Sequence, residues 1–333
     1  MEKNKHPSDL FVDTWNIDKL KKKILNVPFP EFQLDKIEFH MTSNCNLRCG
    51  FCYGKEFRPI THRNLDKDVI IETLKEVENI NPFIVFSGLY SEPLLHPDFK
   101  EIIGAIGDLK MRFGIYTNAM LLNEDIMKEI IKAAQQNVKE SPSYVSIDVS
   151  ASMYANKLDI QLENIKKLKQ LAQSTNLTLN ATLFPYKEDM MDEIEETIIK
   201  LNEIGVDNIR LSSAWDIKDK HDIMFKELTK LSKLKENITI RYDNEFEKCH
   251  TMLQSVCIDS DGNVFPCPEL CSPCIKDIYS FGNIKEEPLL KIFRGDRHRK
   301  LFDRLNPKLE NCKCCPMDYK KNVLCDNILR YGQ

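Results

Sequence analysis

Three cysteines, Cys45, Cys49 and Cys52, lie close together in the segment CNLRCGFC. Thiolates bind soft metals or exchange disulfides, and three kinds of site compete for this spacing. A zinc site normally takes four protein ligands in two pairs, and no second pair lies nearby. A redox pair of Cys49 and Cys52 leaves Cys45 without a role. An iron-sulfur cluster bound by three thiolates uses all of them and leaves one iron open for chemistry.

The remaining cysteines favour metal binding over disulfides. The chain carries 12 cysteines, and none falls between Cys52 and Cys249. The charged N-terminal sequence lacks the apolar core of an export signal, so we expect a cytoplasmic protein whose thiols stay reduced. The sequence therefore predicts two metal sites that are far apart along the chain.

The composition is that of a folded protein with a small or peptidic partner. The 333 residues are 42% hydrophobic, which is enough for one large core and a smaller domain. The formal net charge of -4 argues against a dedicated binder of nucleic acid or of an anionic membrane. We therefore expect neither nucleic acid nor membrane among the partners.

Short runs of β-branched and aromatic residues alternate with amphipathic segments between the two cysteine sites. In the amphipathic segments apolar residues recur at helical spacing, as in Ile70, Leu74 and Val77. Six such strand-helix units predict the α/β class, with a partial (β/α)6 TIM-like barrel. The predicted strands are 36–42, 83–88, 112–118, 144–150, 177–184 and 207–213.

Three domains follow from this pattern. Residues 1–35 form an N-terminal extension with one amphipathic helix, residues 36–245 form the partial barrel, and residues 246–333 form a small cysteine-rich α+β extension. Active sites of such barrels open at the carboxyl ends of the strands. Because Cys45 comes three residues after the first predicted strand, the three thiols are expected at that end.

The spacing Cys45-x3-Cys49-x2-Cys52, with Phe51 before the last cysteine and a barrel strand before the first, resembles the radical S-adenosylmethionine (SAM) superfamily. The resemblance implies a 4Fe-4S cluster on these thiolates, whose fourth iron is chelated by SAM, with Phe51 as a cofactor contact. It also implies that one electron, from a flavodoxin- or ferredoxin-type donor, cleaves SAM to a 5′-deoxyadenosyl radical that abstracts hydrogen from a substrate.

The stretch after the second predicted strand resembles the Gly-Gly-Glu-Pro stretch of this family. Here the sequence runs from Gly88 to Glu92 and Pro93, with the glycine pair lost and the spacing lengthened. The resemblance implies that Glu92 and the backbone near Gly88 receive the ammonium group of SAM.

Later strand ends supply further polar residues that the resemblance implies near the cofactor. Asn118 matches a family position that contacts the ribose or the substrate, Ser146 lies near the cofactor, and Arg210 pairs with the methionine carboxylate. Asp148 points toward the centre of the barrel and is a candidate catalytic residue. Each of these groups has the alternative of satisfying a buried neighbour or capping a helix.

The second cysteine site begins with a predicted β-hairpin whose turn contains Gly262. The hairpin and the later segment CKCC bring four cysteines together, and the layout resembles the SPASM and Twitch extensions of the same superfamily. The resemblance implies at least one auxiliary 4Fe-4S cluster. Its expected ligands are Cys249, Cys267, Cys312 and Cys315.

The other C-terminal cysteines leave two alternatives open. Lys321 stands where the full SPASM pattern has a cysteine, which favours one auxiliary cluster. A second cluster by an unusual route, or a zinc ribbon, remains an alternative. Cys257 is a candidate catalytic donor of a hydrogen atom, or an inert core residue. The unassigned thiols are Cys257, Cys271, Cys274, Cys314 and Cys325.

By analogy with the family, we expect a radical SAM enzyme that cross-links, epimerises or decarboxylates a ribosomally made peptide. A dehydrogenase or epimerase of a sugar or aminocyclitol is the first alternative. A non-catalytic iron-sulfur carrier or scaffold is the second. His40 and His96 are interpreted as packing and turn residues, because neither has a second ligand at metal-binding spacing.

Overall fold

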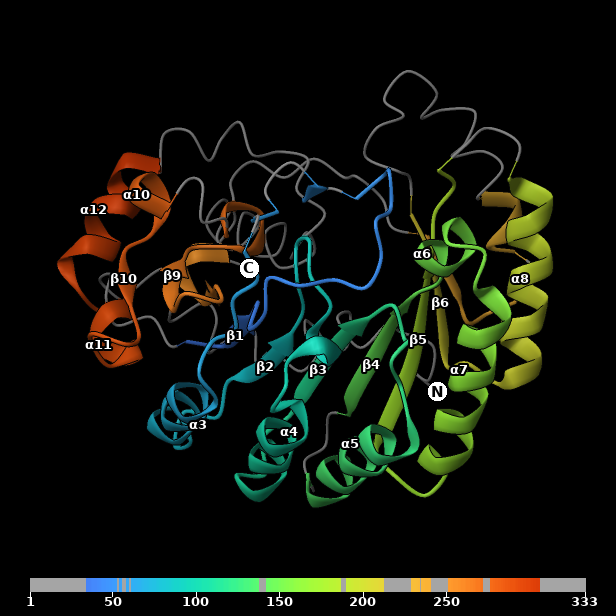
Figure 1. Cartoon of the computed structure of the whole chain (residues 1–333), viewed down its shortest axis with the longest axis horizontal. Helices are drawn as coiled ribbons and strands as arrows, with labels where there is room; N and C mark the ends of the chain where they lie inside the picture. The colour runs from blue at the N-terminus through green and yellow to red at the C-terminus, as the bar shows by residue number, and fades with distance from the viewer. Residues whose placement is uncertain are drawn as a thin grey trace, which may run out of the picture.

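In the part of the chain that the structure describes, ten strands form one continuous sheet, and helices line its outer side (Figure 1). The strands are β1 Lys36–Phe39, β2 Phe83–Phe86, β3 Phe113–Thr117, β4 Ser143–Asp148, β5 Leu177–Leu183, β6 Asn208–Leu211, β7 Ile238–Ile240, β8 Ser255–Ile258, β9 Asn263–Phe265 and β10 Gly282–Asn283. The computed structural model describes residues 34–52, 54–55, 58–59, 61–137, 142–186, 190–212, 229–233, 235–240, 251–271 and 276–305.

The predicted partial barrel is confirmed. Strands β1 to β6 are neighbours in chain order and pair in parallel, and β7 adds to β6 in the same direction. The predicted strand 36–42 is too long, since β1 ends at Phe39.

The helices between and after the strands are α3 Lys67–Glu76, α4 Phe99–Asp108, α5 Glu124–Gln136, α6 Val149–Tyr154, α7 Leu158–Ala172, α8 Met191–Ile204, α10 Lys276–Tyr279, α11 Leu289–Phe293 and α12 Asp296–Leu305. Three short 3-10 turns are η2 Pro93–Leu95, η4 Thr251–Leu253 and η5 Pro268–Leu270.

The core lies between the sheet and these helices. Parallel strands covered by helices read as continuous apolar runs, and all four residues of β2 are buried. Helix α3 shows how the flanking layer forms: the side chain of Asp66 accepts a hydrogen bond from the backbone N of Asp68 at the N-terminus. Ile70 and Leu74, one turn apart, are buried against the sheet.

The C-terminal extension continues the barrel sheet. Strand β8 pairs in parallel with β1, and β9 returns antiparallel to β8, which confirms the predicted hairpin. Gly262 in its turn has a φ of 87°, a left-handed conformation that glycine adopts without a steric cost. Strand β1 therefore has a parallel neighbour on each side.

A second contact docks the extension against the barrel. The two carboxylate oxygens of Glu76 in α3 accept hydrogen bonds of 2.8 Å from the backbone N atoms of Leu289 and Leu290, at the start of α11. These donors have no partner within their own helix, so a carboxylate there is stabilising. Figure 1 shows α11 beside α3 at this junction.

Some sequence predictions lie outside the described residues. These are the N-terminal helix within residues 1–33 and the expected cluster ligands Cys249, Cys312 and Cys315. Among the helices that are described, none combines the length and the apolar character needed to cross a bilayer.

Candidate active site

A cavity of about 350 Å³ opens at the carboxyl ends of the barrel strands. Its lining includes Cys45, Cys49 and Cys52, as the strand order predicted. It also includes polar residues from the ends of β2 to β6, which the parallel pairing brings to one edge of the sheet. The structure brings together here the catalytic candidate Asp148 and the predicted cofactor contacts Phe51, Gly88, Glu92, Asn118, Ser146 and Arg210.

The cysteine loop folds back on itself through short backbone contacts. The backbone N of Cys52 donates to the carbonyl of Cys49 at 3.2 Å, and the N of Leu47 donates to the sulfur of Cys45 at 3.4 Å. Burial, together with the negative charges of Asp148 and of the neighbouring thiolates, raises the pKa of the Cys49 thiol to about 12. Three crowded thiolates are stable when a cationic metal centre binds them, so the donor set fits an iron-sulfur cluster.

Phe51 belongs to an aromatic cluster beside this loop. Its ring stacks on Tyr186 with centroids 5.1 Å apart, and it meets Phe184 and Tyr154 edge-on at 4.8 and 5.3 Å. Such pairs are each worth about 0.5–1.5 kcal/mol beyond burial. Because Tyr154 ends α6 and Phe184 follows β5, the cluster fixes the cysteine loop against the end of one helix and the end of one strand.

Glu92 lies fully inside the cavity wall. Its carboxylate accepts hydrogen bonds from Thr117 Oγ1 at 2.7 Å and from the backbone N atoms of Asn118 and Leu94 at 2.8 and 3.2 Å. Burial, followed by the negative charge of Asp148, raises the pKa of Glu92 to about 7 despite these three donors. A cationic ligand group beside Glu92 would favour its ionised form.

Gly88 and Asn118 fix the position of loops that line the cavity. A Cβ atom at Gly88 would overlap Ser91 Oγ and lie 2.9 Å from the carbonyl oxygen of Ser91. The side chain of Asn118 donates to Asn46 Oδ1 at 2.9 Å and accepts from the backbone N of Met120 at 3.0 Å. Asn118 therefore links the cysteine loop to the end of β3.

Strands β4, β5 and β6 present a polar row, with Asp148, Thr182 and Arg210 in register. Asp148 accepts from the backbone N of Ala151 at 3.1 Å and so caps α6. Burial raises the pKa of Asp148 to about 6, against the lowering effect of its backbone donors and of Arg210. Arg210 Nη2 donates to Thr182 Oγ1 at 3.1 Å.

Four buried polar atoms in this lining have no partner among the described residues. They are the Oγ atoms of Ser91 and Ser146 and the Nε atoms of Arg58 and Arg210. Buried polar groups normally pair, so unpaired hydroxyls and guanidinium nitrogens in one cavity indicate a polar ligand. SAM, which carries hydroxyl, carboxylate and ammonium groups, fits this requirement.

The described cysteines of the extension differ in burial and in position. Cys267 is half-buried just after β9, and its three expected partners lie outside the described residues. Cys257 is fully buried in β8 and lies outside the cavity lining, with Cys271 as a close neighbour. Its predicted role as a donor of hydrogen atoms finds no support in this position.

Several cavity residues were missed by the sequence interpretation. Thr182 and Phe184 follow the period-2 alternation of β5, which would have placed them on one face with Asn180. Arg58 comes from the irregular segment after Cys52 and carries no such signal. His96 is confirmed as a turn residue: its Nε2 lies 2.7 Å from the carbonyl oxygen of Leu65, and its Nδ1 accepts from the backbone N of Asp98.

Comparison with known families agrees with this geometry. Residues 39–201 match the model of the radical SAM superfamily, and residues 249–316 match SPASM, an iron-sulfur cluster-binding domain. Together the two matches cover more than half of the chain. The chain belongs to the radical SAM superfamily. Radical SAM membership with a SPASM domain means a SAM-binding 4Fe-4S cluster, SAM itself and at least one auxiliary iron-sulfur cluster.

Individual relatives of this radical SAM enzyme are distant. A tungsten-containing aldehyde ferredoxin oxidoreductase cofactor-modifying protein from Pyrococcus furiosus is 23% identical over 78% of this chain and 80% of its own length. The crystal structure of Streptococcus suis SuiB bound to S-adenosylmethionine has a TM-score of 0.59 and 14% identity, over 79% of this chain and 66% of that one. The crystal structure of SuiB bound to precursor peptide SuiA has a TM-score of 0.58 and 16% identity, over 84% of this chain and 67% of that one. These similarities show the fold.

Proposed function

We propose that this radical SAM enzyme modifies a ribosomally made peptide by abstracting hydrogen from one of its residues, which leads to a cross-link, an epimerisation or a decarboxylation. The cavity that holds Cys45, Cys49 and Cys52 together with unpartnered polar atoms, among them Ser146 Oγ and Arg210 Nε, carries the proposal. The SPASM match and the similarity to SuiB bound to a precursor peptide support a peptide as the substrate.

When bound, the cluster and SAM supply a one-electron cleavage that yields a hydrogen-abstracting radical. We assign Cys45, Cys49 and Cys52 as cluster ligands. Glu92 would accept from the ammonium of SAM, since its ionised form is stabilised by a cation. Arg210 would bind the carboxylate through its unpartnered Nε.

The remaining cavity residues would position the cofactor and the substrate. We assign the Oγ of Ser146 and the aromatic face of Phe51 to the nucleoside part of SAM. Gly88 keeps the loop after β2 close to the cavity, and Asn118 orients the ribose or the substrate. Asp148 faces the centre of the barrel and, with a pKa of about 6, is suited to move a proton near neutral pH.

The reaction balances with one external electron per SAM. A flavodoxin- or ferredoxin-type donor would provide that electron, methionine would be released, and one hydrogen atom would pass from a substrate carbon to the 5′ carbon of the nucleoside. For a cross-link or a decarboxylation, the auxiliary centre would accept the further electron that the substrate loses. For an epimerisation, a thiol would return a hydrogen atom to the substrate carbon, and an electron and a proton would then restore that thiol.

Anaerobic incubation with deuterated candidate peptides tests this function. We expect deuterium in 5′-deoxyadenosine with the correct peptide and none with Cys52→Ala, the matched control that removes one cluster ligand. A peptide encoded beside this chain's own gene is the first substrate to use. Label that enters from a deuterated sugar or aminocyclitol, and from no peptide, would contradict the peptide proposal.

A small molecule is the second candidate substrate, because the Pyrococcus furiosus relative is named for modifying a cofactor. An iron-sulfur carrier is the third alternative, and it requires no SAM cleavage. Formation of 5′-deoxyadenosine by the reduced protein, lost in Cys52→Ala, would exclude the carrier.

A further inference from the structure

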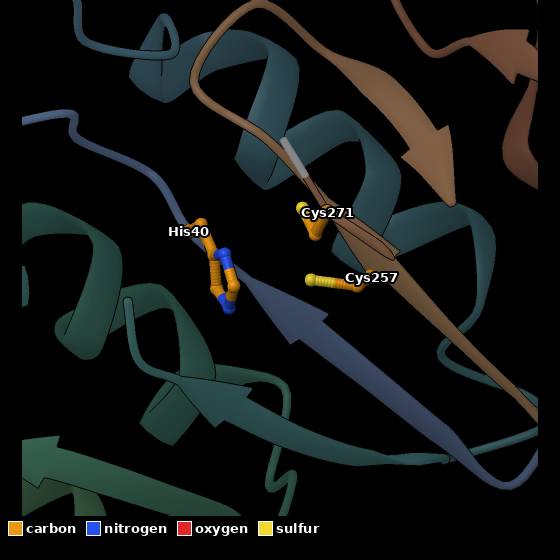
Figure 2. A group of neighbouring side chains, drawn as sticks. All are labelled: His40, Cys257 and Cys271. Atoms are coloured by element: carbon orange, nitrogen blue, oxygen red, sulfur yellow. The ribbon is translucent and has the colours of Figure 1, made fainter. Parts of the chain in front are cut away.

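A histidine and two cysteines meet at the junction between barrel and extension. His40 follows β1, Cys257 lies in β8, and Cys271 follows η5. One ligand atom from each lies within 4.8 Å of the others, and all three residues are buried. Figure 2 shows the three side chains pointing toward one another from these separate segments.

The spacing of these atoms suits one ion rather than a cubane cluster. Ligands of a tetrahedral zinc ion lie about 3.7 Å apart, given Zn–S bonds of about 2.3 Å. Thiolates on different irons of a 4Fe-4S cluster lie roughly 6 Å apart, because each binds its own corner. A group within 4.8 Å requires only a small contraction around a single ion.

The surroundings of His40 are those of a metal-bound imidazole. Its Nε2 lies 3.4 Å from Oε1 of Glu38, and the same oxygen accepts from Ser87 Oγ at 2.5 Å. Metal-binding histidines commonly donate their other ring N–H to a carboxylate, which fixes the tautomer. Nδ1 is then the nitrogen available to a metal on the side of the cysteines.

The donor types also favour a metal ion. Cys257 and Cys271 are almost fully buried, with 0% and 1% of their surface exposed. As neutral groups, two thiols and an imidazole offer one another only weak S–H hydrogen bonds. A divalent ion would hold both as thiolates, and imidazole with thiolate is a donor set for zinc rather than for magnesium or calcium.

We propose that His40, Cys257 and Cys271 bind a single zinc ion, with a solvent molecule as the fourth ligand. The ion is separate from the SAM-binding cluster and from the auxiliary set of Cys249, Cys267, Cys312 and Cys315. It ties the end of β1 to β8 and to the loop after η5. Because His40 also lines the cavity, the ion fixes the position of the extension relative to the active site.

Metal analysis of the full chain tests this site. The protein is purified without oxygen, its iron-sulfur clusters are reconstituted, and zinc and iron are counted by mass spectrometry. The wild type is expected to hold about one zinc per chain. His40→Gln, Cys257→Ser and Cys271→Ser should each lose at least five-fold in zinc, with the iron content unchanged.

Two controls separate this site from the proposed function. Cys52→Ala should lose SAM cleavage and keep its zinc, so that a failure of one proposal leaves the other intact. Zinc-edge X-ray absorption of the wild type should show a mixed shell of sulfur and nitrogen, which needs no variant to fold. Zinc that survives all three substitutions, iron lost in place of zinc, or an all-sulfur shell would each overturn the proposal.

Discussion

The hydroxyl of Thr117 at the end of β3 donates a 2.7 Å hydrogen bond to Glu92, which stands in the loop after β2. The same carboxylate accepts from the backbone N of Asn118, so two neighbouring strand ends share one buried acid. Glu92 therefore holds the rim of the cavity in addition to its proposed contact with SAM.

Glu92→Gln replaces one carboxylate oxygen, which accepts hydrogen bonds, by an amide NH2 group, which donates them. The new NH2 group would face a donor that now bonds to Glu92. We expect a loss of about 1–3 kcal/mol in stability, the cost of leaving a buried donor unpaired. We also expect at least ten-fold weaker SAM binding, measured by anaerobic calorimetry. Thr117→Val is the control, since it removes the hydrogen bond to Glu92 and the one that Thr117 Oγ1 accepts from the backbone N of Ala119, and it keeps the acid. Equal SAM affinity in wild type and Glu92→Gln would remove Glu92 from the proposed cofactor contacts.

Ser146→Ala should separate binding from stability. The Oγ of Ser146 is buried without a partner among the described residues, so its removal should leave the unfolding temperature unchanged or raise it. SAM affinity should fall about five-fold, the loss of one hydrogen bond of about 1 kcal/mol.

Ser150→Ala provides the opposite case. Its Oγ donates to the carbonyl oxygen of Phe184 and accepts from the N of Phe184, both at 2.8 Å, and it lies outside the cavity lining. This variant should be destabilised by about 1–3 kcal/mol. The reverse pattern, a less stable Ser146→Ala with full SAM affinity, would show that Ser146 is structural.

Gly88→Ala should weaken SAM binding about ten-fold or more, because the added Cβ displaces Ser91 and with it the loop that lines the cavity. Equilibrium dialysis with labelled SAM measures this. Gly104→Ala in α4 is the matched control: its Cβ would meet only Glu129 Oε2 at 3.9 Å. That control should bind normally and gain about 0.5–1 kcal/mol in stability. Normal binding by Gly88→Ala would show that the loop tolerates the shift.

Replacing a cysteine should remove only the iron-sulfur cluster to which we assign it. Cys52→Ala should abolish 5′-deoxyadenosine formation, while Cys312→Ala should remove about four irons per chain, the content of one 4Fe-4S centre. Iron content and SAM cleavage are measured on the same anaerobic samples. An unchanged iron count in Cys312→Ala would break the proposed group of four auxiliary ligands.

His298 should make the extension sensitive to acid. Its ring is buried, stacks on Phe281 with centroids 4.2 Å apart, and lies 2.7 Å from the carbonyl oxygen of Phe293 through Nδ1. Burial lowers its pKa from 6.5 to about 4. Between these pH values the unfolded chain binds more protons than the folded one, so stability is full above pH 6.5 and falls toward pH 4.

The size of this effect is about 2–3 kcal/mol, and His298→Gln should remove it. Thermal unfolding at pH 7.5 and at pH 5 measures the difference for wild type and variant. The unfolding temperature of the wild type should fall more between pH 7.5 and pH 5 than that of the variant. An identical shift in both proteins would assign the acid sensitivity to other groups.

Local patterns in the sequence predicted much of this fold. Each barrel strand is a short β-branched or aromatic run, and the turn at Gly262 predicted the hairpin of β8 and β9. The parallel pairing of β8 with β1 was not predicted, because alternation along a strand carries no information about a distant partner.

The same limit explains the site. Cys45, Cys49 and Cys52 are near one another in sequence and were found from their spacing alone. His40 was interpreted as a packing residue, since its neighbours Cys257 and Cys271 reach it only through the pairing of β8 with β1. Ligands that come from distant segments leave no spacing pattern in the sequence from which the site could be predicted.

That pairing also has a consequence for synthesis. Until the ribosome has delivered Ser255–Ile258, one side of β1 offers its amide and carbonyl groups to any extended strand nearby. A fragment truncated ahead of Ser255 would keep helices α3 to α8 and strands β1 to β7 and yet expose an unprotected edge. Such a fragment should aggregate in the cell rather than persist as an independent barrel.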